Sequence, residues 1–381
     1  MSRKTAKKHL LFLKVKKGVK ALTNRVICAK INIEKKRKLS IGRQEMRAIY
    51  LANRKSNIDY VYSKESQERI KKLADIDTEV YCQEDLEVNP DGFKDVEYVF
   101  STWSMPGGSE DKDDFARFFP SCKAFFYAAG SVKYFADHWL NRGIRIFSAF
   151  AANAIPVAEY SVAQILLANK GFFHASRMLV KPEMHSEALD VSKKHCGNYD
   201  AKVGIIGAGM IGKKVIELLK PYKLNIFVFD KFLSEEQIAT LGATKATLEE
   251  VFENCDVVSN HLANVPQTVG IIKGEHFAKM KEYATFINTG RGAQICEDEM
   301  ISVLKERKDI TALLDVTIEE PPVQDSPLYT MENVVLTPHI AGSQANEVQR
   351  MSELVVDQFE NLLAGKPTQY EITKEMLAKM A

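Results

Sequence analysis

The sequence predicts an α/β protein with two doubly wound parallel-sheet domains. It has 381 residues, 45% of them hydrophobic and 27% charged, which is a globular composition in a chain too long for one compact core. Short apolar runs alternate with helical or turn-rich segments in both halves, as they do in βαβ units. The second half adds a glycine-rich turn directly after one of its apolar runs. These three observations together favour two separate parallel sheets.

In the first half, regular structure is expected to begin at residue 46, because residues 46–52 alternate like a strand and residues 64–73 follow as an amphipathic helix. Further strands are expected at three short apolar runs, residues 96–101, 124–128 and 144–148. Residues 154–173 predict a long helix, since Pro156 falls in the first turn, where its missing N–H is tolerated. This helix is expected to mark the junction between the domains.

The second half has six patterns typical of buried strands, at residues 202–206, 225–229, 256–260, 285–288, 310–315 and 334–337. Six such strands suffice for a doubly wound domain. One more amphipathic helix is expected at 345–364, and the segment after it is too short for another domain. We therefore expect a first domain of residues 46–152 completed by 345–381, and a second domain of residues 153–344.

The charge is unevenly distributed, although the net charge is only +2. Residues 1–45 carry fifteen Lys and Arg against Glu34 and Glu45, so this basic extension has a charge of +13 and the remainder −11. Such a block could touch an anionic surface or act as a targeting segment. It is rich in Lys rather than in Arg and Ser, and its one aromatic residue is Phe12. We therefore expect a solvated, poorly ordered extension that binds no nucleic acid.

Cysteine usage and hydropathy predict a soluble protein of a reducing compartment, hence a cytoplasmic one. The six cysteines, at positions 28, 82, 122, 196, 255 and 296, form no C-x-x-C pair and no disulfide-like rhythm. No metal site is therefore expected. The apolar runs are too short or too polar to cross the ~30 Å hydrocarbon layer, so no membrane partner is expected either.

A phosphate-binding turn is predicted where the first strand of the second half ends. Gly207, Gly209 and Gly212 form G-x-G-x-x-G, whose intervening positions include Met210 and Ile211, and a helical pattern follows. In this arrangement Gly207 permits the tight turn, Gly209 lets a pyrophosphate approach, and Gly212 lets the helix pack closely on the strand. The exposed N–H groups and the helix dipole favour a diphosphate. A glycine trio alone can be a simple turn, but here strand, glycines, helix and a later acid are in register.

That acid is Asp230, which ends the next strand eighteen residues beyond Gly212. A carboxylate at this place can accept hydrogen bonds from both ribose hydroxyls of a dinucleotide, and it would repel the extra 2′-phosphate of NADP. NAD is therefore the expected cofactor, although the cationic Lys231 beside the acid leaves NADP open.

Three strand ends of the second half offer the groups that hydride transfer to a 2-oxo acid requires. Arg291, in Asn-Thr-Gly-Arg-Gly, can bind a carboxylate bidentately and polarise the C2 carbonyl. His339, in Thr-Pro-His-Ile-Ala-Gly, can give or take the hydroxyl proton. A neighbouring carboxylate would fix the tautomer of His339, and Glu320 is the expected partner. Each residue alone also has a structural reading, as a surface ion pair, a turn or a core histidine.

In these motifs the chain resembles the D-isomer-specific 2-hydroxyacid dehydrogenase family, from about residue 46 onward and most densely between Asn153 and Gly342. The glycine fingerprint with Asp230, the two motifs above and the Asp-Val…Glu-Pro segment match the family in order and spacing. The resemblance implies a Rossmann NAD-binding domain at residues 153–344 and a flavodoxin-like substrate domain from the rest of the body.

The resemblance also implies the roles of individual residues. Arg291, Glu320 and His339 would be the catalytic residues, with Glu320 preferred to Glu319 because the family's acid directly precedes proline. Asp315 would hydrogen-bond the nicotinamide carboxamide. Further residues expected to line the cofactor cleft are His261, Thr289, Gly290 and Gly342.

On the substrate side, the chain has a counterpart of the family loop whose backbone N–H groups bind the substrate carboxylate. The expected substrate contacts are Ala129, Gly130, Ser131 and Trp103. Many family members have an aspartate where this chain has Val132. Trp103 either shapes the pocket or is a packed aromatic side chain, and Lys133 either meets a phosphate or is solvated.

The expected reaction is hydride transfer between NAD and C2 of a small D-2-hydroxy or 2-oxo acid. By resemblance it is expected in a homodimer whose interface includes the helix near residues 153–173. Two alternatives stay open: oxidation of 3-phosphoglycerate, and a non-enzymatic NAD-sensing protein like the corepressors that share this fold. The presence of all three catalytic residue types favours an enzyme.

Overall fold

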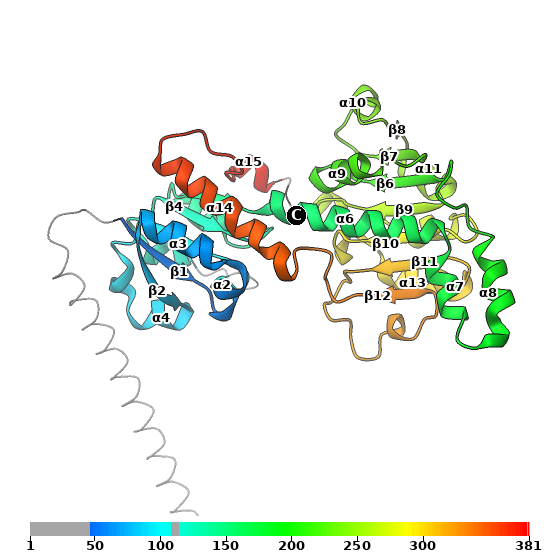
Figure 1. Ribbon diagram of the computed structural model, residues 1–381, viewed down its shortest axis with the longest axis horizontal. Coiled ribbons are helices and arrows are strands. Elements are labelled where there is room, and N and C mark those ends of the chain that lie inside the picture. The colour runs from blue at the N-terminus through cyan, green and yellow to red at the C-terminus, as the bar shows by residue number, and fades with distance from the viewer. Residues whose placement is uncertain (1–45, 108–113, 379, 381) are drawn as a thin grey trace, which may run out of the picture. The chain divides into compact units, whose positions relative to one another are not determined.

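The computed structural model describes residues 46–107, 114–378 and 380, and the basic extension predicted at 1–45 lies outside these residues. The described chain contains two wholly parallel β-sheets with helices on both faces of each (Figure 1). The predicted fold class is thereby confirmed. Apolar runs form such sheets because both faces of each strand are covered by helices, so that side chains on either face are buried.

The five-stranded sheet has the strand order β2-β1-β3-β4-β5. Its strands are β1 (Arg47–Leu51), β2 (Asp75–Tyr81), β3 (Tyr98–Ser101), β4 (Ala124–Tyr127) and β5 (Arg145–Ser148). One face is covered by α2 (Ser56–Val61), α3 (Lys64–Leu73) and α14 (Val348–Leu363). The other is covered by α4 (Gln83–Val88), α5 (Ala136–Asn141), α15 (Lys374–Leu377) and two 3-10 turns, η1 (Pro90–Phe93) and η2 (Phe115–Phe118).

Helix α14 joins this first core although it lies more than 200 residues after β4. Its Phe359 packs edge-on against Phe100 of β3 and Phe126 of β4, with ring centroids 5.1 and 5.2 Å apart. Phe126 in turn stacks on Phe147 of β5. The aromatic contacts tie the end of the chain to the middle of the five-stranded sheet.

The seven-stranded sheet has the order β12-β11-β10-β9-β6-β7-β8. Its strands are β6 (Lys202–Ile206), β7 (Asn225–Phe229), β8 (Thr244–Lys245), β9 (Val257–Asn260), β10 (Thr285–Asn288), β11 (Thr311–Leu314) and β12 (Val334–Leu336). One face is covered by α6 (Phe150–Asn169), α9 (Met210–Leu219) and α10 (Glu235–Thr240). The other is covered by α11 (Leu248–Asn254), α12 (Gly274–Ala278) and α13 (Glu297–Glu306). Strand order reverses between β6 and β9, which is where such sheets bind ligands.

The predicted helix at 154–173 is wrong at both ends. Helix α6 starts at Phe150 and ends at Asn169, and Gly171 has φ +68°, a left-handed conformation that breaks the helix. A separate helix, α7 (Phe172–Met178), follows, and after the turn η3 (Pro182–Met184) comes α8 (His185–Ser192). A single glycine inside an apolar pattern therefore separates two helices.

Strand β2 was not predicted, because its sequence Asp-Ile-Asp-Thr-Glu-Val-Tyr is largely polar. Its place at the edge of the sheet explains the composition, since only Ile76 of the strand is buried. Helix α6 has the length and apolar composition of a membrane-crossing helix. It contacts α9, β9, β10 and α14, so a core helix accounts for the same composition.

Candidate functional site

The glycine turn after β6 has the geometry that its sequence predicts. Gly207 has φ +88°, and a Cβ there would lie 3.0 Å from the backbone of His261. A Cβ on Gly212 would lie 2.0 Å from the carbonyl oxygen of Gly207, so α9 packs directly on the turn. A Cβ on Gly209 would meet no atom within 4 Å, and this residue precedes α9 without providing a side-chain cap. The first turn of α9, with the exposed Met210 and the partly buried Ile211, therefore offers an open helix N-terminus that fits a diphosphate.

Asp230 lies directly after β7 and holds the turn from the other side. Its carboxylate accepts hydrogen bonds from the backbone N–H groups of Ala208 at 2.9 Å, Phe232 at 2.8 Å and Leu233 at 3.0 Å. A carboxylate has about four acceptor positions, so about one stays available for a ribose hydroxyl. The side chain thus stabilises the turn as well as offering an acceptor to a dinucleotide.

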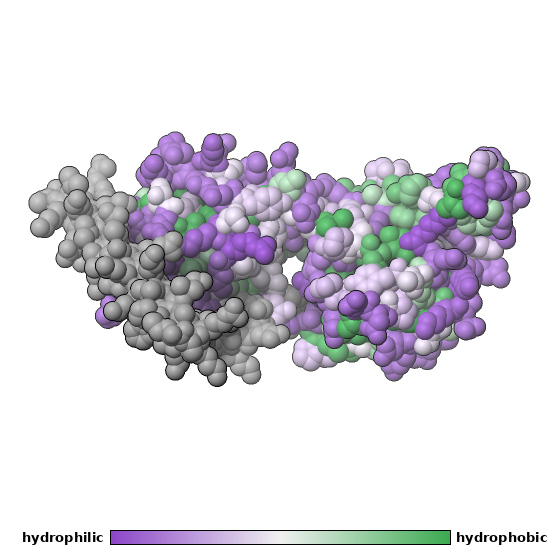
Figure 2. Space-filling view, turned by 90° about the horizontal axis from the view of Figure 1, so that it is seen from below, coloured by the Kyte–Doolittle hydropathy of each residue, from purple (hydrophilic) through white to green (hydrophobic). Residues whose placement is uncertain are grey.

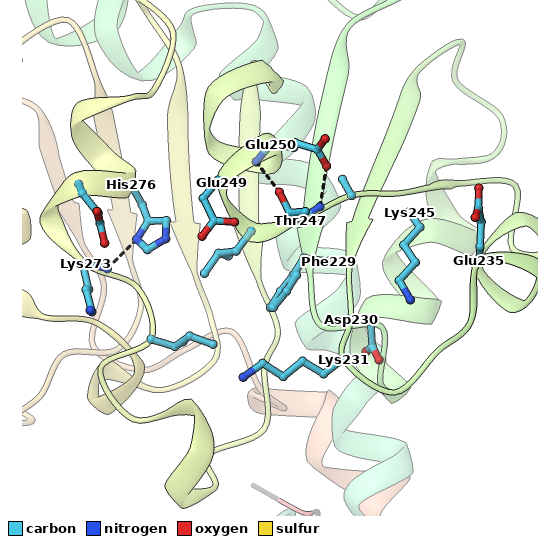
Figure 3. A pocket seen from close by; sticks show the side chains of 14 residues that line it. Phe229, Asp230, Lys231, Glu235, Lys245, Thr247, Glu249, Glu250, Lys273 and His276 are labelled. Carbon is cyan, nitrogen blue, oxygen red and sulfur yellow. Dashed lines mark hydrogen bonds between the residues drawn. The ribbon is translucent and has the colours of Figure 1, made fainter.

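A pocket of about 770 Å³ opens beside Asp230 (Figure 3). Phe229, Lys231, Thr247 and His276 line it together with several further charged side chains. Thr247 and Glu250 form a reciprocal capping box at the start of α11. This pocket contains none of Arg291, Glu320 and His339, so it suits the adenosine end of a dinucleotide rather than the reacting end.

Arg291 follows β10 in a loop that buried amide side chains hold in place. Asn260 donates hydrogen bonds to Asn288 Oδ1 at 3.0 Å and Gln294 Oε1 at 2.7 Å, and all three side chains are buried. Gln294 Oε1 also accepts the N–H of Arg291, and Asn288 Oδ1 accepts the N–H of Gly290. Among the described residues, the guanidinium donates only to the carbonyl of Gly290, at 2.7 Å. Its remaining N–H groups are available for a carboxylate ligand.

Sequence reasoning missed this amide network. Asn260 and Asn288 each end a strand that is otherwise apolar, and Gln294 follows two positions after Gly292. Polar amides at the ends of buried strands are a usable signal, because a buried amide must find partners. Which amides meet was decided by strands β9 and β10 lying side by side.

Asp315, directly after β11, is buried and organises the loop that carries His339. Its carboxylate accepts hydrogen bonds from Thr337 Oγ1 at 2.6 Å and from the N–H groups of Ile340 and Ala341, both at 2.9 Å. The N–H of His339 bonds the carbonyl of Asp315 at 3.0 Å. His339 itself has φ +53°, which is unusual for a residue other than glycine and is over-determined here by these bonds.

Glu320 meets His339 across the loop. His339 Nδ1 lies 2.6 Å from Glu320 Oε2. An ionised carboxylate only accepts hydrogen bonds, so the proton lies on Nδ1 and leaves Nε2 as the other reactive nitrogen. Glu319, the alternative, faces solvent, and its carbonyl accepts a bond from Thr317. The structure therefore brings Glu320 and His339 together.

Arg291 and the Glu320 loop are joined through Gly292. A Cβ on Gly292 would lie 1.9 Å from the carbonyl carbon of Thr317, so these two loops touch backbone to backbone. Glu297 at the start of α13 adds a hydrogen bond at 3.1 Å from the N–H of Ile318 to its carboxylate. The loops after β10, β11 and β12 thus form one connected edge of the sheet.

His261, after β9, is buried. Its Nε2 lies 2.9 Å from Ser259 Oγ and its Nδ1 lies 3.4 Å from Thr289 Oγ1. Burial lowers the pKa of His261 to about 3, so the imidazole is neutral at ordinary pH. A neutral, enclosed ring fits the expectation that His261 and Thr289 belong to the lining rather than to the proton transfer.

The expected substrate loop follows β4. Ser148 Oγ donates to the carbonyls of Ala129 and Gly130 at 3.0 and 2.6 Å, whereas the N–H groups of these two residues have no hydrogen-bond partner in the described chain. Asn153 links this loop to the His339 loop. A Cβ on Gly130 would lie 3.4 Å from Asn153 Nδ2, and Asn153 Oδ1 accepts the N–H of Ser343 at 2.9 Å.

The other expected residues have mixed placements. A Cβ on Gly342 would lie 3.2 Å from Asn153 Oδ1, so Gly342 allows close approach. Trp103 packs against the hydrophobic cores on both faces of the five-stranded sheet, which supports its reading as a packed aromatic side chain. Ser131 Oγ accepts the N–H of Lys133 at 3.4 Å. Among the described residues, no group of His, Cys, Asp or Glu is arranged to hold a metal, and the five described cysteines are unpaired.

Comparison with known proteins gives a family match for the second half of the chain. Residues 162–341 match the family model of the D-isomer specific 2-hydroxyacid dehydrogenase NAD-binding domain. A glyoxylate reductase of Korarchaeum cryptofilum is 30% identical over 240 residues, which cover 63% of this chain and 71% of that protein. A D-3-phosphoglycerate dehydrogenase of Archaeoglobus fulgidus is 30% identical over 228 residues, which cover 59% of this chain and 42% of the relative. The chain thus spans about half the length of several curated relatives that it matches.

Solved structures agree on the fold. The D-mandelate dehydrogenase of Rhodotorula graminis superposes with a TM-score of 0.72 at 21% sequence identity, covering 86% of this chain and 98% of that one. At this identity the likeness concerns the fold alone. The family match confirms the resemblance stated from the motifs and the assignment of NAD as the cofactor of the second domain.

Proposed function

Because the chain belongs to the D-isomer-specific 2-hydroxyacid dehydrogenase family, we propose that it transfers a hydride between NAD and C2 of a small D-2-hydroxy or 2-oxo acid. The observation that carries this proposal is the 2.6 Å contact between His339 Nδ1 and Glu320 Oε2. This contact lies on the same sheet edge as the Arg291 guanidinium, most of whose N–H groups have no partner among the described residues. An acid–base pair and a carboxylate-binding cation are the groups that this reaction requires of the protein.

In this mechanism each residue acts on one part of the substrate. NAD, when bound along Gly207 to Gly212, supplies or accepts the hydride. Arg291 would bind the substrate carboxylate with its free N–H groups and polarise the C2 carbonyl. His339 would deliver a proton from Nε2 to the nascent hydroxyl during reduction and remove it during oxidation. Glu320 would hold the Nδ1 proton, so that the ring keeps its orientation and its positive charge is stabilised in the protonated form.

The same contact favours an enzyme over an NAD-sensing corepressor-like protein. A sensor needs the dinucleotide turn but gains nothing from a histidine held by a carboxylate at the reacting end. Oxidation of 3-phosphoglycerate stays within the proposed chemistry, and several relatives carry the name D-3-phosphoglycerate dehydrogenase. The phosphorylated substrate is therefore one of the compounds to test.

The test is an NADH-consumption screen with the full chain. Pyruvate, hydroxypyruvate, glyoxylate, branched 2-oxo acids and 3-phosphohydroxypyruvate are each supplied with NADH, and absorbance at the nicotinamide band is followed. We expect steady turnover with at least one of them and formation of the D-hydroxy acid. Binding of NADH without turnover on any 2-oxo acid would favour the sensor instead.

We also propose that the protein forms a homodimer through α6, α7 and α8. Large apolar side chains are exposed there, at Leu167, Phe172, Leu179, Val180 and Leu189. On the face of the molecule that Figure 2 presents, hydrophobic residues appear as separate patches on a hydrophilic surface. A cluster of exposed apolar side chains on neighbouring helices is typical of a surface that a second copy covers.

Light scattering during size-exclusion chromatography tests the dimer. The double variant Leu179→Glu, Val180→Glu places two charges on this surface and is expected to shift the mass from two chains to one. Val88→Glu is the matched control, because Val88 is 46% exposed on α4, outside this cluster. A wild-type protein that elutes as a monomer at micromolar concentration would contradict the proposal.

A further inference from the structure

Lys133 occupies an unusual place between the two sheets' loops. It follows the expected substrate loop after β4, and its ammonium group donates a hydrogen bond to the backbone carbonyl of Asn264. Asn264 lies in the segment after β9, three residues beyond His261. The side chain is partly buried, so its ammonium is held at a defined place rather than spread over solvent positions.

Among the described residues, no side chain supplies a counter-charge to Lys133. A backbone carbonyl is neutral, and no carboxylate within the described residues forms an ion pair with this lysine. Two other partly buried cations do have such partners: Arg69 pairs with Glu360 and Arg145 with Glu371. A cation that is partly desolvated and uncompensated favours an anionic ligand.

Lys133 follows a loop that Asn153 links to the His339 loop of the proposed active site. Asn153 touches the position of Gly130 on one side and binds the N–H of Ser343, just after the His339 motif, on the other. Arg291 is likewise a cation at this edge without a carboxylate partner among the described residues. Two uncompensated cations suit a ligand with two anionic groups.

The neighbour Val132 adds to the same conclusion. The position directly before Lys133 is an apolar, fully buried valine. It therefore supplies no carboxylate that could neutralise the ammonium. Two backbone N–H groups without a partner among the described residues, those of Ala129 and Gly130, therefore lie a few residues from one positive charge.

We propose that Lys133 binds a second anionic group of the substrate, at the end remote from the C1 carboxylate. The preferred substrate is then a 2-oxo or 2-hydroxy acid that carries a further carboxylate or a phosphate, rather than a simple aliphatic acid. This inference rests on the proposed dehydrogenase function. Arg291 would hold the C1 carboxylate, and Lys133 would select among acids by their second charge.

The experiment compares acids that differ in the second charge. Initial rates with NADH are measured for 2-oxoglutarate, 3-phosphohydroxypyruvate and uncharged-tail 2-oxopentanoate, in the wild type and in Lys133→Met. For the wild type we expect kcat/KM to be at least tenfold higher for one of the two dianionic acids than for 2-oxopentanoate. In Lys133→Met this ratio falls at least about tenfold, the range expected for a lost hydrogen bond to a charged group. The dianion with the higher ratio identifies the second group as carboxylate or phosphate.

Three controls separate this role from others. Lys374→Met removes an ammonium that also bonds a neutral oxygen, that of Asn141, and it should leave the ratio at the wild-type value. Lys133→Arg keeps the charge and should restore part of the preference. Fluorescence titration with NADH should give the same Kd in Lys133→Met as in the wild type.

Several results would overturn the inference. An equal loss of kcat/KM with all three acids would mean that Lys133 has a structural role. A higher Kd for NADH would mean that it binds the cofactor. A wild type that shows no preference for either dianion would also exclude it. If no acid is turned over at all, the proposed function fails. The role of Lys133 is then tested by the change in melting temperature that 2-oxoglutarate or 3-phosphohydroxypyruvate causes in the NADH complex. Equal changes in melting temperature in the wild type and in Lys133→Met would then contradict the inference.

Discussion

At the residue scale, the chemistry of the site depends on one histidine whose conformation its neighbours impose. His339 has φ +53° because Asp315 binds the N–H groups of Ile340 and Ala341 with its buried carboxylate. The ring is then close enough for the 2.6 Å contact with Glu320. One carboxylate thus fixes the backbone after His339 and another contacts its ring, an arrangement that a histidine packed in a hydrophobic core does not need.

Replacing His339 tests its proposed role. In His339→Gln we expect kcat/KM for any accepted 2-oxo acid to fall by about 10² to 10⁴-fold, the usual contribution of a general acid. The Kd of NADH should stay within about twofold, because the glycine turn lies after a different strand. His185→Gln is the control, since His185 is exposed on α8. A variant of His339 with near-normal rates would refute the assignment.

Asp230 governs the choice between NADH and NADPH. In Asp230→Asn the side chain loses its charge and gains an N–H donor that faces the N–H groups of Ala208, Phe232 and Leu233. We expect the Kd of NADH to rise about tenfold or more and the preference for NADH over NADPH to narrow, since the repulsion of the 2′-phosphate disappears. Fluorescence titration with both cofactors measures this. A wild type that binds NADPH more tightly would show that Lys231 dominates instead.

At the element scale, one glycine of the turn before α9 is needed for packing and another for cofactor binding. A Cβ on Gly212 would meet the backbone oxygen of Gly207 at 2.0 Å, and backbone cannot rotate aside as a side chain does. A Cβ on Gly209 would meet nothing within 4 Å, and its φ of −72° suits any residue. The two glycines therefore serve the different purposes that the motif predicts for them: Gly212 allows close packing of α9, and Gly209 leaves room for a ligand.

A pair of alanine variants tests this distinction. Gly212→Ala should lower the stability by about 1–3 kcal/mol, as overpacking does, and with it the melting temperature. Gly209→Ala should melt within about 2 °C of the wild type yet bind NADH at least about tenfold more weakly, because its methyl group occupies the approach of the diphosphate. Differential scanning calorimetry and NADH titration give the two readouts. Equal melting temperatures in both variants would contradict the packing described for α9.

At the scale of the whole molecule, buried neutral histidines make the stability depend on pH. Burial lowers the pKa of His195 to about 4 and that of His261 to about 3. His195 packs against Gly171, where a Cβ would meet its ring at 2.4 Å, and the backbone of His261 lies 3.0 Å from the place of a Cβ on Gly207. The first histidine thus lies beside the start of α7, and the second lies beside the glycine turn of the cofactor site.

The direction of the pH effect follows from proton binding. Below pH 6.5 the unfolded chain protonates these histidines, whereas the folded chain stays neutral until its lowered pKa values are reached. Stability is therefore fully present above about pH 6.5 and falls steadily as the pH drops toward 4. Urea unfolding at pH 7.5, 6.0 and 5.0 measures it. His195→Gln should flatten the decline, whereas His185→Gln on the exposed surface should leave it as it is in the wild type.

How far the elements could be predicted depended on their place in the sheets. Central strands such as β6, β9 and β10 were predicted to within about one residue, because burial on both faces makes them apolar runs. Strand β2 escaped prediction because an edge strand tolerates polar residues. The helix predicted at 154–173 runs past its observed end at Asn169 because Gly171 breaks it, and it begins earlier than predicted, at Phe150. The prediction for residues 1–45 stays a prediction.

The sequence by itself determined the fold class, the dinucleotide turn and the candidate acid, base and guanidinium, because each depends on a short pattern read along one strand and its following loop. Only the tertiary structure decided that Glu320 rather than Glu319 meets His339, that Asn260, Asn288 and Gln294 hold the Arg291 loop, and that the ammonium of Lys133 meets Asn264. These contacts join side chains from different strands and loops. Their partners follow from strand order and loop geometry, which no local pattern contains.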